Sequence, residues 1–129
     1  MRLYKRKMLL IVLVILFMTN TAIVFAVEDE ETWQYYYDKS NIKYKLREYE
    51  KALSFIDLAL DINNKIPAIY KLKGEIYIKL HKFNEAIFCY DEALKLGEHE
   101  ATFYLSKGIA YLYLKENEKA VNLFKCLEG

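Results

Sequence analysis

The chain has 129 residues, of which 54% are hydrophobic and 16% aromatic, and this is enough for one domain with a packed core. Its 19 Lys and Arg residues nearly balance its 18 Asp and Glu residues, which excludes the basic stripe that nucleic-acid binding requires. The charges are unevenly distributed along the chain. Residues 2–7 contain several Lys and Arg residues and form a basic head, whereas the first acidic residue is Glu28.

An apolar segment follows this basic head and extends over residues 8–27, with a polar interruption at 19–21. A helix over 8–27 would be roughly 30 Å long, the thickness of the hydrocarbon core of a bilayer. Two interpretations remain open for residues 1–27: a transmembrane anchor that is retained, or a signal peptide cleaved after Ala26. Under both, the head stays in the cytoplasm, and the chain beyond the acidic linker at 28–32 lies outside it, membrane-anchored or secreted.

Beyond the linker, apolar residues recur at spacings of three and four, which predicts helices and not strands. The predicted helices cover residues 33–46, 49–62, 67–80, 83–96, 101–114 and 117–128. Pro67 falls at a first helical position, and Gly97 falls just past a helix end, where a left-handed residue is favoured. Short turns such as 81–82 join the helices into antiparallel hairpins, so we expect an all-α domain over 33–129.

The hairpins repeat with a period of 34 residues. The positions that coincide include Ala52, Ala86 and Ala120; Tyr36, Tyr70 and Tyr104; Ser40, Gly74 and Gly108; and Ile56, Tyr90 and Phe124. A fixed period of this length predicts one unit that is copied and stacked. We expect Gly74 and Gly108 to lie where the two helices of a hairpin cross, with the alanines providing room from the partner helix.

This helix-turn-helix pattern resembles the tetratricopeptide repeat (TPR) family, with repeats at 33–66, 67–100 and 101–129. The resemblance implies a right-handed superhelix, or α-solenoid. The sequence departs from the family pattern at Lys43, where the other copies have tyrosine, and at the lysine that precedes the small residue in every copy, where the family has leucine.

The resemblance also implies a concave groove, lined by the first helix of each pair. The candidate groove residues are Tyr37, Asn41, Tyr44, Lys71, Glu75, Lys79, Ile109 and Tyr113, and the groove lining would also include Leu72, Ile78, Ser106 and Leu112. Such a groove would bind a peptide through apolar contacts with the tyrosine rings and charged contacts with the lysine side chains. A solvated helix face is the alternative, and the four-residue spacing of Lys71, Glu75 and Lys79 also fits pairing along one helix. Of the family's chaperone-type carboxylate clamp, only Asn41 is present.

The last predicted helix carries a second candidate surface. Its apolar residues are Val121, Leu123, Phe124 and Leu127, and no polar capping helix follows them in the sequence. We expect this end to dock on a partner or on a second copy of the chain, unless the gene is truncated.

The sequence carries no motif of an enzyme, a metal site or a cofactor site. Cys89 and Cys126 are predicted to face different directions, so buried free thiols are favoured over a disulfide. The resulting hypothesis is an extracytoplasmic, membrane-tethered or exported scaffold for protein–protein interaction. The alternative is a structural or oligomeric subunit of a cell-envelope assembly that docks through its last helix.

Overall fold

The structure is a computed structural model that describes the backbone at residues 2–28, 32–97 and 99–128. Side chains are described at 2–19, 32–97 and 99–128. The chain divides into two compact units, Met1–Glu31 and Thr32–Gly129.

The first unit contains one helix, α1 (Arg2–Glu28). Its large apolar side chains from Met8 to Met18 are exposed. Within the residues that the structure describes, none of the helices combines the length and the apolar character needed to cross a membrane. Two predictions fall partly outside the described part: the segment at 8–27, through the side chains of 20–27, and the linker at 28–32, through residues 29–31.

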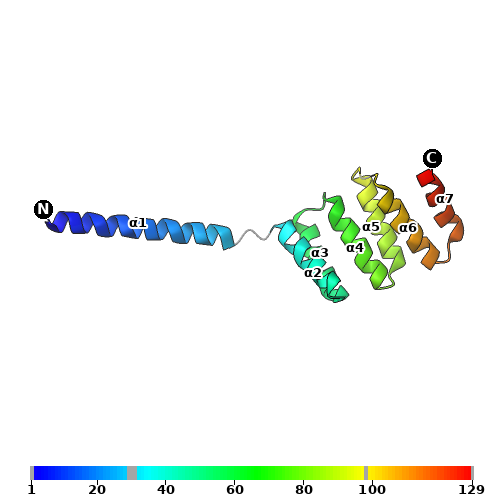
Figure 1. Cartoon of the computed structure of the whole chain (residues 1–129), viewed down its shortest axis with the longest axis horizontal. Coiled ribbons are helices and arrows are strands. Elements are labelled where there is room, and N and C mark those ends of the chain that lie inside the picture. The colour runs from blue at the N-terminus through cyan, green and yellow to red at the C-terminus, as the bar shows by residue number, and fades with distance from the viewer. Residues whose placement is uncertain (1, 29–31, 98, 129) are drawn as a thin grey trace. The chain divides into compact units, whose positions relative to one another are not determined.

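The second unit consists of three helical hairpins, as predicted (Figure 1). The helices are α2 (Trp33–Lys45), α3 (Tyr49–Ile62), α4 (Pro67–Lys79), α5 (Phe83–Lys95), α6 (Ala101–Tyr113) and α7 (Asn117–Glu128). Each begins at its predicted residue and ends within one residue of its predicted end. Pro67 occupies the first turn of α4, and the Thr32 hydroxyl caps α2 by accepting a hydrogen bond from the Tyr35 amide.

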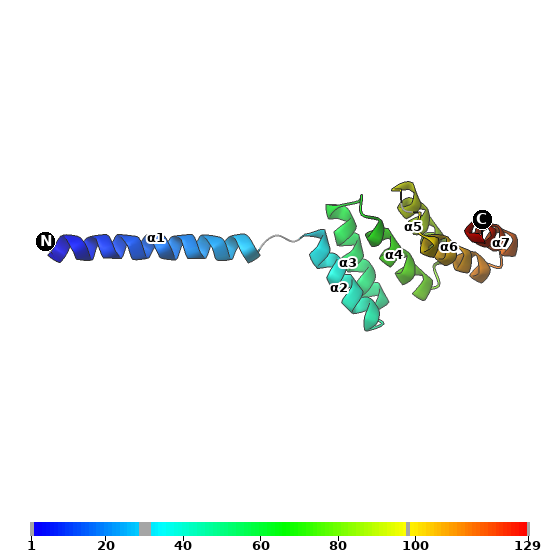
Figure 2. The same ribbon diagram turned by 45° about the horizontal axis from the view of Figure 1, so that its top comes forward.

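The helices of the second unit pack side by side in chain order (Figure 2). Helices pack within each hairpin, and α3 and α5 then pack on the first helix of the following hairpin. The first helices also contact one another, α2 with α4 and α4 with α6, whereas among the described residues the second helices form no comparable contact. The stack therefore curves toward the side of α2, α4 and α6.

The turn inside each hairpin contains a non-glycine residue with a left-handed backbone. These residues, Arg47, His81 and Lys115, have φ values of 61°, 58° and 61° and follow the same period of 34. The first turn shows the hydrogen-bond pattern of a Schellman motif, because the Arg47 amide donates to the Tyr44 carbonyl and the Glu48 amide to the Lys43 carbonyl. The predicted left-handed residue after α5 is also confirmed, since Gly97 has a φ of 92°.

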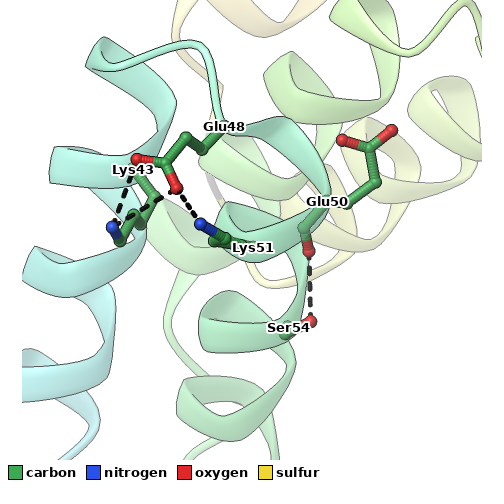
Figure 3. A network of polar contacts seen from close by, with 5 residues as sticks. All are labelled: Lys43, Glu48, Glu50, Lys51 and Ser54. Carbon is green, nitrogen blue, oxygen red and sulfur yellow. Dashed lines mark hydrogen bonds and ion pairs between the residues drawn. The ribbon is translucent and has the colours of Figure 1, made fainter.

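A polar cluster closes the first of these turns (Figure 3). The Glu48 carboxylate lies 3.3 Å from Lys43 Nζ and 2.5 Å from Lys51 Nζ. Its hydrogen bonds with Lys51 and then Lys43 lower the pKa of Glu48. Lys43 stands at the position of a tyrosine in the other repeats, and this pairing gives its side chain a partner at the start of α3.

The aligned small residues occupy the predicted crossings. Ala52, Ala86 and Ala120 are all fully buried. A Cβ atom added to Gly74 would lie 2.7 Å from Cε1 of Tyr90, and one added to Gly108 would meet the ring of Phe124. Each of these rings belongs to the second helix of the same hairpin, so the absence of a side chain makes room for an aromatic ring.

The first repeat has different residues at the equivalent helix crossing. Ser40 takes the place of the glycine and is completely buried, and its hydroxyl donates a 2.8 Å hydrogen bond to the Ala52 carbonyl. The residue aligned with the aromatic rings is Ile56, which is smaller and also fully buried. A larger residue on one helix is therefore matched by a smaller one on the other.

Ion pairs join each repeat to the next. Lys73 Nζ lies 2.8 Å from Asp57 Oδ1, and Lys107 Nζ lies 2.5 Å from Asp91 Oδ1. Both pairs connect the second helix of one repeat with the first helix of the next, at equivalent positions. The recurrent lysine that departs from the family pattern thus contributes to the contact between repeats.

The two cysteines differ in environment. Cys89 is buried, as predicted, and burial raises the pKa of its thiol to about 12. The prediction of a buried thiol was wrong for Cys126, which is exposed. Among the described helices α7 packs on α6 alone, so the outer side of α7 remains open to solvent.

Candidate peptide-binding groove

The first helices of all three repeats together line one pocket on the concave side. It has a volume of about 260 Å³ and is lined by Tyr44, Glu75, Ile78, Lys79, Tyr90, Ser106 and Ile109. Six of these seven residues, all except Tyr90, belong to the groove lining predicted from the sequence. The pocket is smaller than a typical drug-sized site, and its volume suits a single long side chain.

Glu75 is the charged group that the pocket desolvates. It is half-buried, and this burial raises the pKa of its carboxyl, while Lys71 and Lys79 act in the opposite direction. The ion pairs formed among residues 32–97 and 99–128 do not include Glu75. The prediction that Glu75 pairs with the lysines along its own helix is therefore not confirmed at ion-pair distance.

Three tyrosines lie within electrostatic reach of this carboxylate. Burial raises the pKa of Tyr37, Tyr44 and Tyr90, and the negative charge of Glu75 adds to each rise. A hydrogen bond with Ser106 lowers the pKa of Tyr90 in part. The site therefore surrounds one carboxylate with aromatic rings from α2 and α5 and with polar and apolar side chains from α6.

An apolar surface continues the pocket along α6. A second pocket, of about 300 Å³, is lined by Ile109, Leu112 and Tyr113, and it shares Ile109 with the first. These three residues are exposed. The ring of Tyr113 stacks on Phe83 with the ring centroids 4.7 Å apart, which fixes one wall of this pocket.

The remaining predicted groove residues lie around these pockets. Tyr37 is half-buried near Glu75, and Asn41 is half-buried but lines neither pocket. Lys71 points its ammonium toward Phe103, 5.7 Å from the ring centroid. The placement of Leu72 in the groove was wrong, because it is 4% exposed and packs in the core cluster with Ala52 and Ile69.

Sequence reasoning did not assign Tyr90 to the groove. Its alignment with Ile56 and Phe124 marked it as a packing residue, and it does pack against Gly74. The absence of a side chain at Gly74 allows the ring to reach through the first-helix layer and contribute to the pocket on the far side. The glycine and the tyrosine together are the signal that could have identified it.

The candidate docking surface on α7 is only partly exposed. Val121 and Leu127 are 45% and 38% exposed, and Leu123 is half-buried. Phe124 lies against Gly108 inside the third hairpin. Lys125, at the position of Asp57 and Asp91, is exposed and carries the opposite charge to those partners of the inter-repeat lysines.

Family models described as tetratricopeptide repeat match residues 34–66 and 67–99. The chain belongs to the tetratricopeptide repeat family, as its sequence predicts. A comparison with curated proteins gives no match.

Solved structures share the fold at low sequence identity. The first TPR of Spaghetti (RPAP3), bound to HSP90 peptide SRMEEVD, is 22% identical with a TM-score of 0.70, over 75% of this chain and 77% of that one. The OM64 TPR domain of Arabidopsis is 23% identical with a TM-score of 0.70, over 74% and 78%. YrrB, described as a TPR protein with an unusual peptide-binding site, is 23% identical with a TM-score of 0.69, over 76% and 50%.

Proposed function

We propose that this protein is a non-catalytic scaffold that binds a protein or peptide in its concave groove. The observation that carries this proposal is the pocket lined by all three repeats, with Tyr44 from α2, Glu75 from α4 and Ile109 from α6. A surface assembled from successive repeats suits an extended ligand, because each repeat contributes side chains to a continuous path. The solved structure of similar fold with a bound HSP90 peptide, and the unusual peptide-binding site of YrrB, support this use of the fold.

We further propose that the scaffold acts outside the cytoplasm, tethered to a membrane or exported. Support comes from the basic residues at 2–7 and the exposed apolar side chains that follow them in α1. Cell fractionation followed by amino-terminal sequencing distinguishes the two forms. A mature chain that begins at residue 27 indicates export, an intact chain in the membrane fraction indicates an anchor, and an intact chain in the cytoplasm refutes the localisation.

The second candidate function is docking through α7 in a cell-envelope assembly or with a second copy of the chain. The exposure of Val121 and Leu127 favours it. Lys125 argues against the stacking of another repeat of the same kind on α7. The first helix of such a repeat would bring its lysine against Lys125, whereas the other repeats present an aspartate to that lysine.

Partner binding by two double variants of the full chain tests the proposed function against this alternative. Tyr44→Ala with Ile109→Ala removes groove surface, and Val121→Ala with Leu127→Ala removes surface from α7; Phe124 is left unchanged because it packs inside the third hairpin. We expect the first variant to lose partners in a quantitative pull-down and the second to keep them. Loss in the second variant alone would refute the groove and support the α7 surface.

A further inference from the structure

The charge in the groove pocket is negative where it is buried and positive only where it is exposed. Of the seven lining residues, Glu75 and Lys79 are charged; Glu75 is half-buried at the middle of α4, whereas Lys79 is exposed near its end. Lys71, the other lysine near Glu75, directs its ammonium toward Phe103. A ligand group that enters the pocket therefore passes Lys79 at the exposed side and meets a carboxylate in the buried part.

Other carboxylates at the contacts between helices have a lysine close by. Asp57, Asp91 and Glu48 all lie within 3.3 Å of a lysine Nζ in ion pairs. Glu75 differs from these half-buried acids, because it forms none of the ion pairs found among the described residues. This holds although a lysine lies four residues before it and another four residues after it in the sequence. A carboxylate that loses water without gaining a partner costs free energy, and a bound cation would recover that cost.

The walls of the pocket suit a cation that carries an apolar stem. Tyr44 lines the pocket beside Glu75, and tyrosine rings attract cations through their faces. Ile78 and Ile109 supply apolar wall area, which fits the hydrocarbon part of a lysine or arginine side chain. The neighbouring pocket, lined by Ile109, Leu112 and Tyr113, is an apolar site where a second side chain of the ligand can bind.

We propose that the groove recognises a peptide segment in which a lysine or arginine side chain enters the Glu75 pocket and a nearby apolar side chain lies on Ile109, Leu112 and Tyr113. This inference rests on the proposed function, because it names the chemistry of the ligand that the groove binds. It is opposite in sign to recognition of an acidic peptide, for which the buried part of the pocket offers a repelling carboxylate. Among the lining residues, Ser106, whose hydroxyl also bonds that of Tyr90, adds an acceptor for a guanidinium or ammonium.

The test uses the full chain in a mild detergent and a phage-displayed library of random dodecapeptides as the probe. The library is selected in parallel on the unchanged chain, on Glu75→Gln, and on Tyr44→Ala with Ile109→Ala. We expect peptides selected on the unchanged chain to share a lysine or arginine near an apolar residue. We expect Glu75→Gln to lose the enrichment of the basic residue and to keep that of the apolar one.

A binding cycle then measures the contact itself by fluorescence anisotropy. Glu75→Gln should weaken the selected peptide by about tenfold or more, and replacing its basic residue with glutamine should weaken it by a similar factor. Combining both changes should cost no more than either one alone, since both remove the same interaction. Glu50→Gln is the matched control, because Glu50 is an exposed glutamate on α3 that lines neither groove pocket, and this change should leave the affinity of the basic peptide unchanged.

The outcomes distinguish failure of the cationic-ligand proposal from failure of the proposal that the groove is the binding surface. Selected peptides that are acidic, or whose basic residue gives additive losses in the cycle, would overturn the cationic ligand while leaving the groove as the binding surface. Peptides that bind the Tyr44→Ala, Ile109→Ala variant as tightly as the unchanged chain would overturn the groove and the proposed function with it. A library that yields no peptide dependent on Tyr44 or Ile109 would count against both.

Discussion

The contact between Gly74 and Tyr90 is the most direct test of how the repeats pack. A methyl group introduced by Gly74→Ala would lie 2.7 and 2.8 Å from two ring atoms of Tyr90, and this ring is 1% exposed, so either the ring or the helix must shift. Overpacking of this kind costs about 1–3 kcal/mol. Alanine in place of glycine inside a helix recovers roughly 0.5–1 kcal/mol, so the midpoints of the two ranges give a net destabilisation of about 1 kcal/mol, with an upper bound of about 2.5 kcal/mol.

The first repeat suggests the compensating change. There a serine faces Ile56, so Tyr90→Ile should relieve the clash that Gly74→Ala creates. Tyr90→Ile alone leaves a cavity and destabilises the domain. The double variant should be more stable than the sum of the single effects predicts, by about 1 kcal/mol or more.

Urea unfolding followed by circular dichroism at 222 nm measures all four forms of this cycle. A Gly74→Ala variant as stable as the unchanged chain, or more stable, would mean that helix propensity outweighs the clash. Strictly additive effects in the double variant would show that the methyl group and the ring do not meet. Either result would refute the packing derived for the crossing.

Three further predictions concern single residues. Arg47→Gly should raise the free energy of unfolding by about 0.5–1 kcal/mol, because glycine adopts the left-handed turn without steric cost, whereas Arg47→Ala should give no gain; equal effects in urea unfolding would contradict this. Glu75→Gln should raise the free energy of unfolding at pH 7 by less than about 1 kcal/mol, since the half-buried carboxylate costs stability when charged. Because folding raises the pKa of Glu75, this gain should shrink as the pH falls through that raised pKa, and a gain that grows toward acid pH would refute the assignment. Iodoacetamide should label Cys126 and leave Cys89 unmodified in the folded chain, as checked by peptide mass mapping, and rapid labelling of Cys89 would contradict its burial.

The helices and their stacking could be predicted from sequence because the 34-residue period constrains every repeat at once. Ala52, Ala86 and Ala120 share one environment, so each copy supports the interpretation of the others. The left-handed turns inside the hairpins were not predicted, although they follow the same period. Glycine marks such a turn at Gly97, but Arg47 and its equivalents carry side chains that give no such signal.

The candidate site was predictable only as a helix face. An α-helix turns by about 100° per residue, so Lys71 lies beside the groove while the adjacent Leu72 lies in the core. The contribution of Tyr90 depends on the gap left by Gly74 on a different helix, and spacing along one helix contains no information about that. The unpaired state of Glu75 likewise depends on where Lys71 points, which the sequence does not determine.

Position-resolved photo-crosslinking in cells that produce the protein tests the central claim, that the concave side binds the partner. A benzophenone amino acid replaces either Tyr113, which lines the groove, or Phe88, which lines neither groove pocket; both are aromatic and similarly exposed, at 59% and 62%. We predict a crosslinked partner from position 113, abolished by Tyr44→Ala, and none from position 88. A partner that crosslinks from position 88 and not from position 113 would contradict the account.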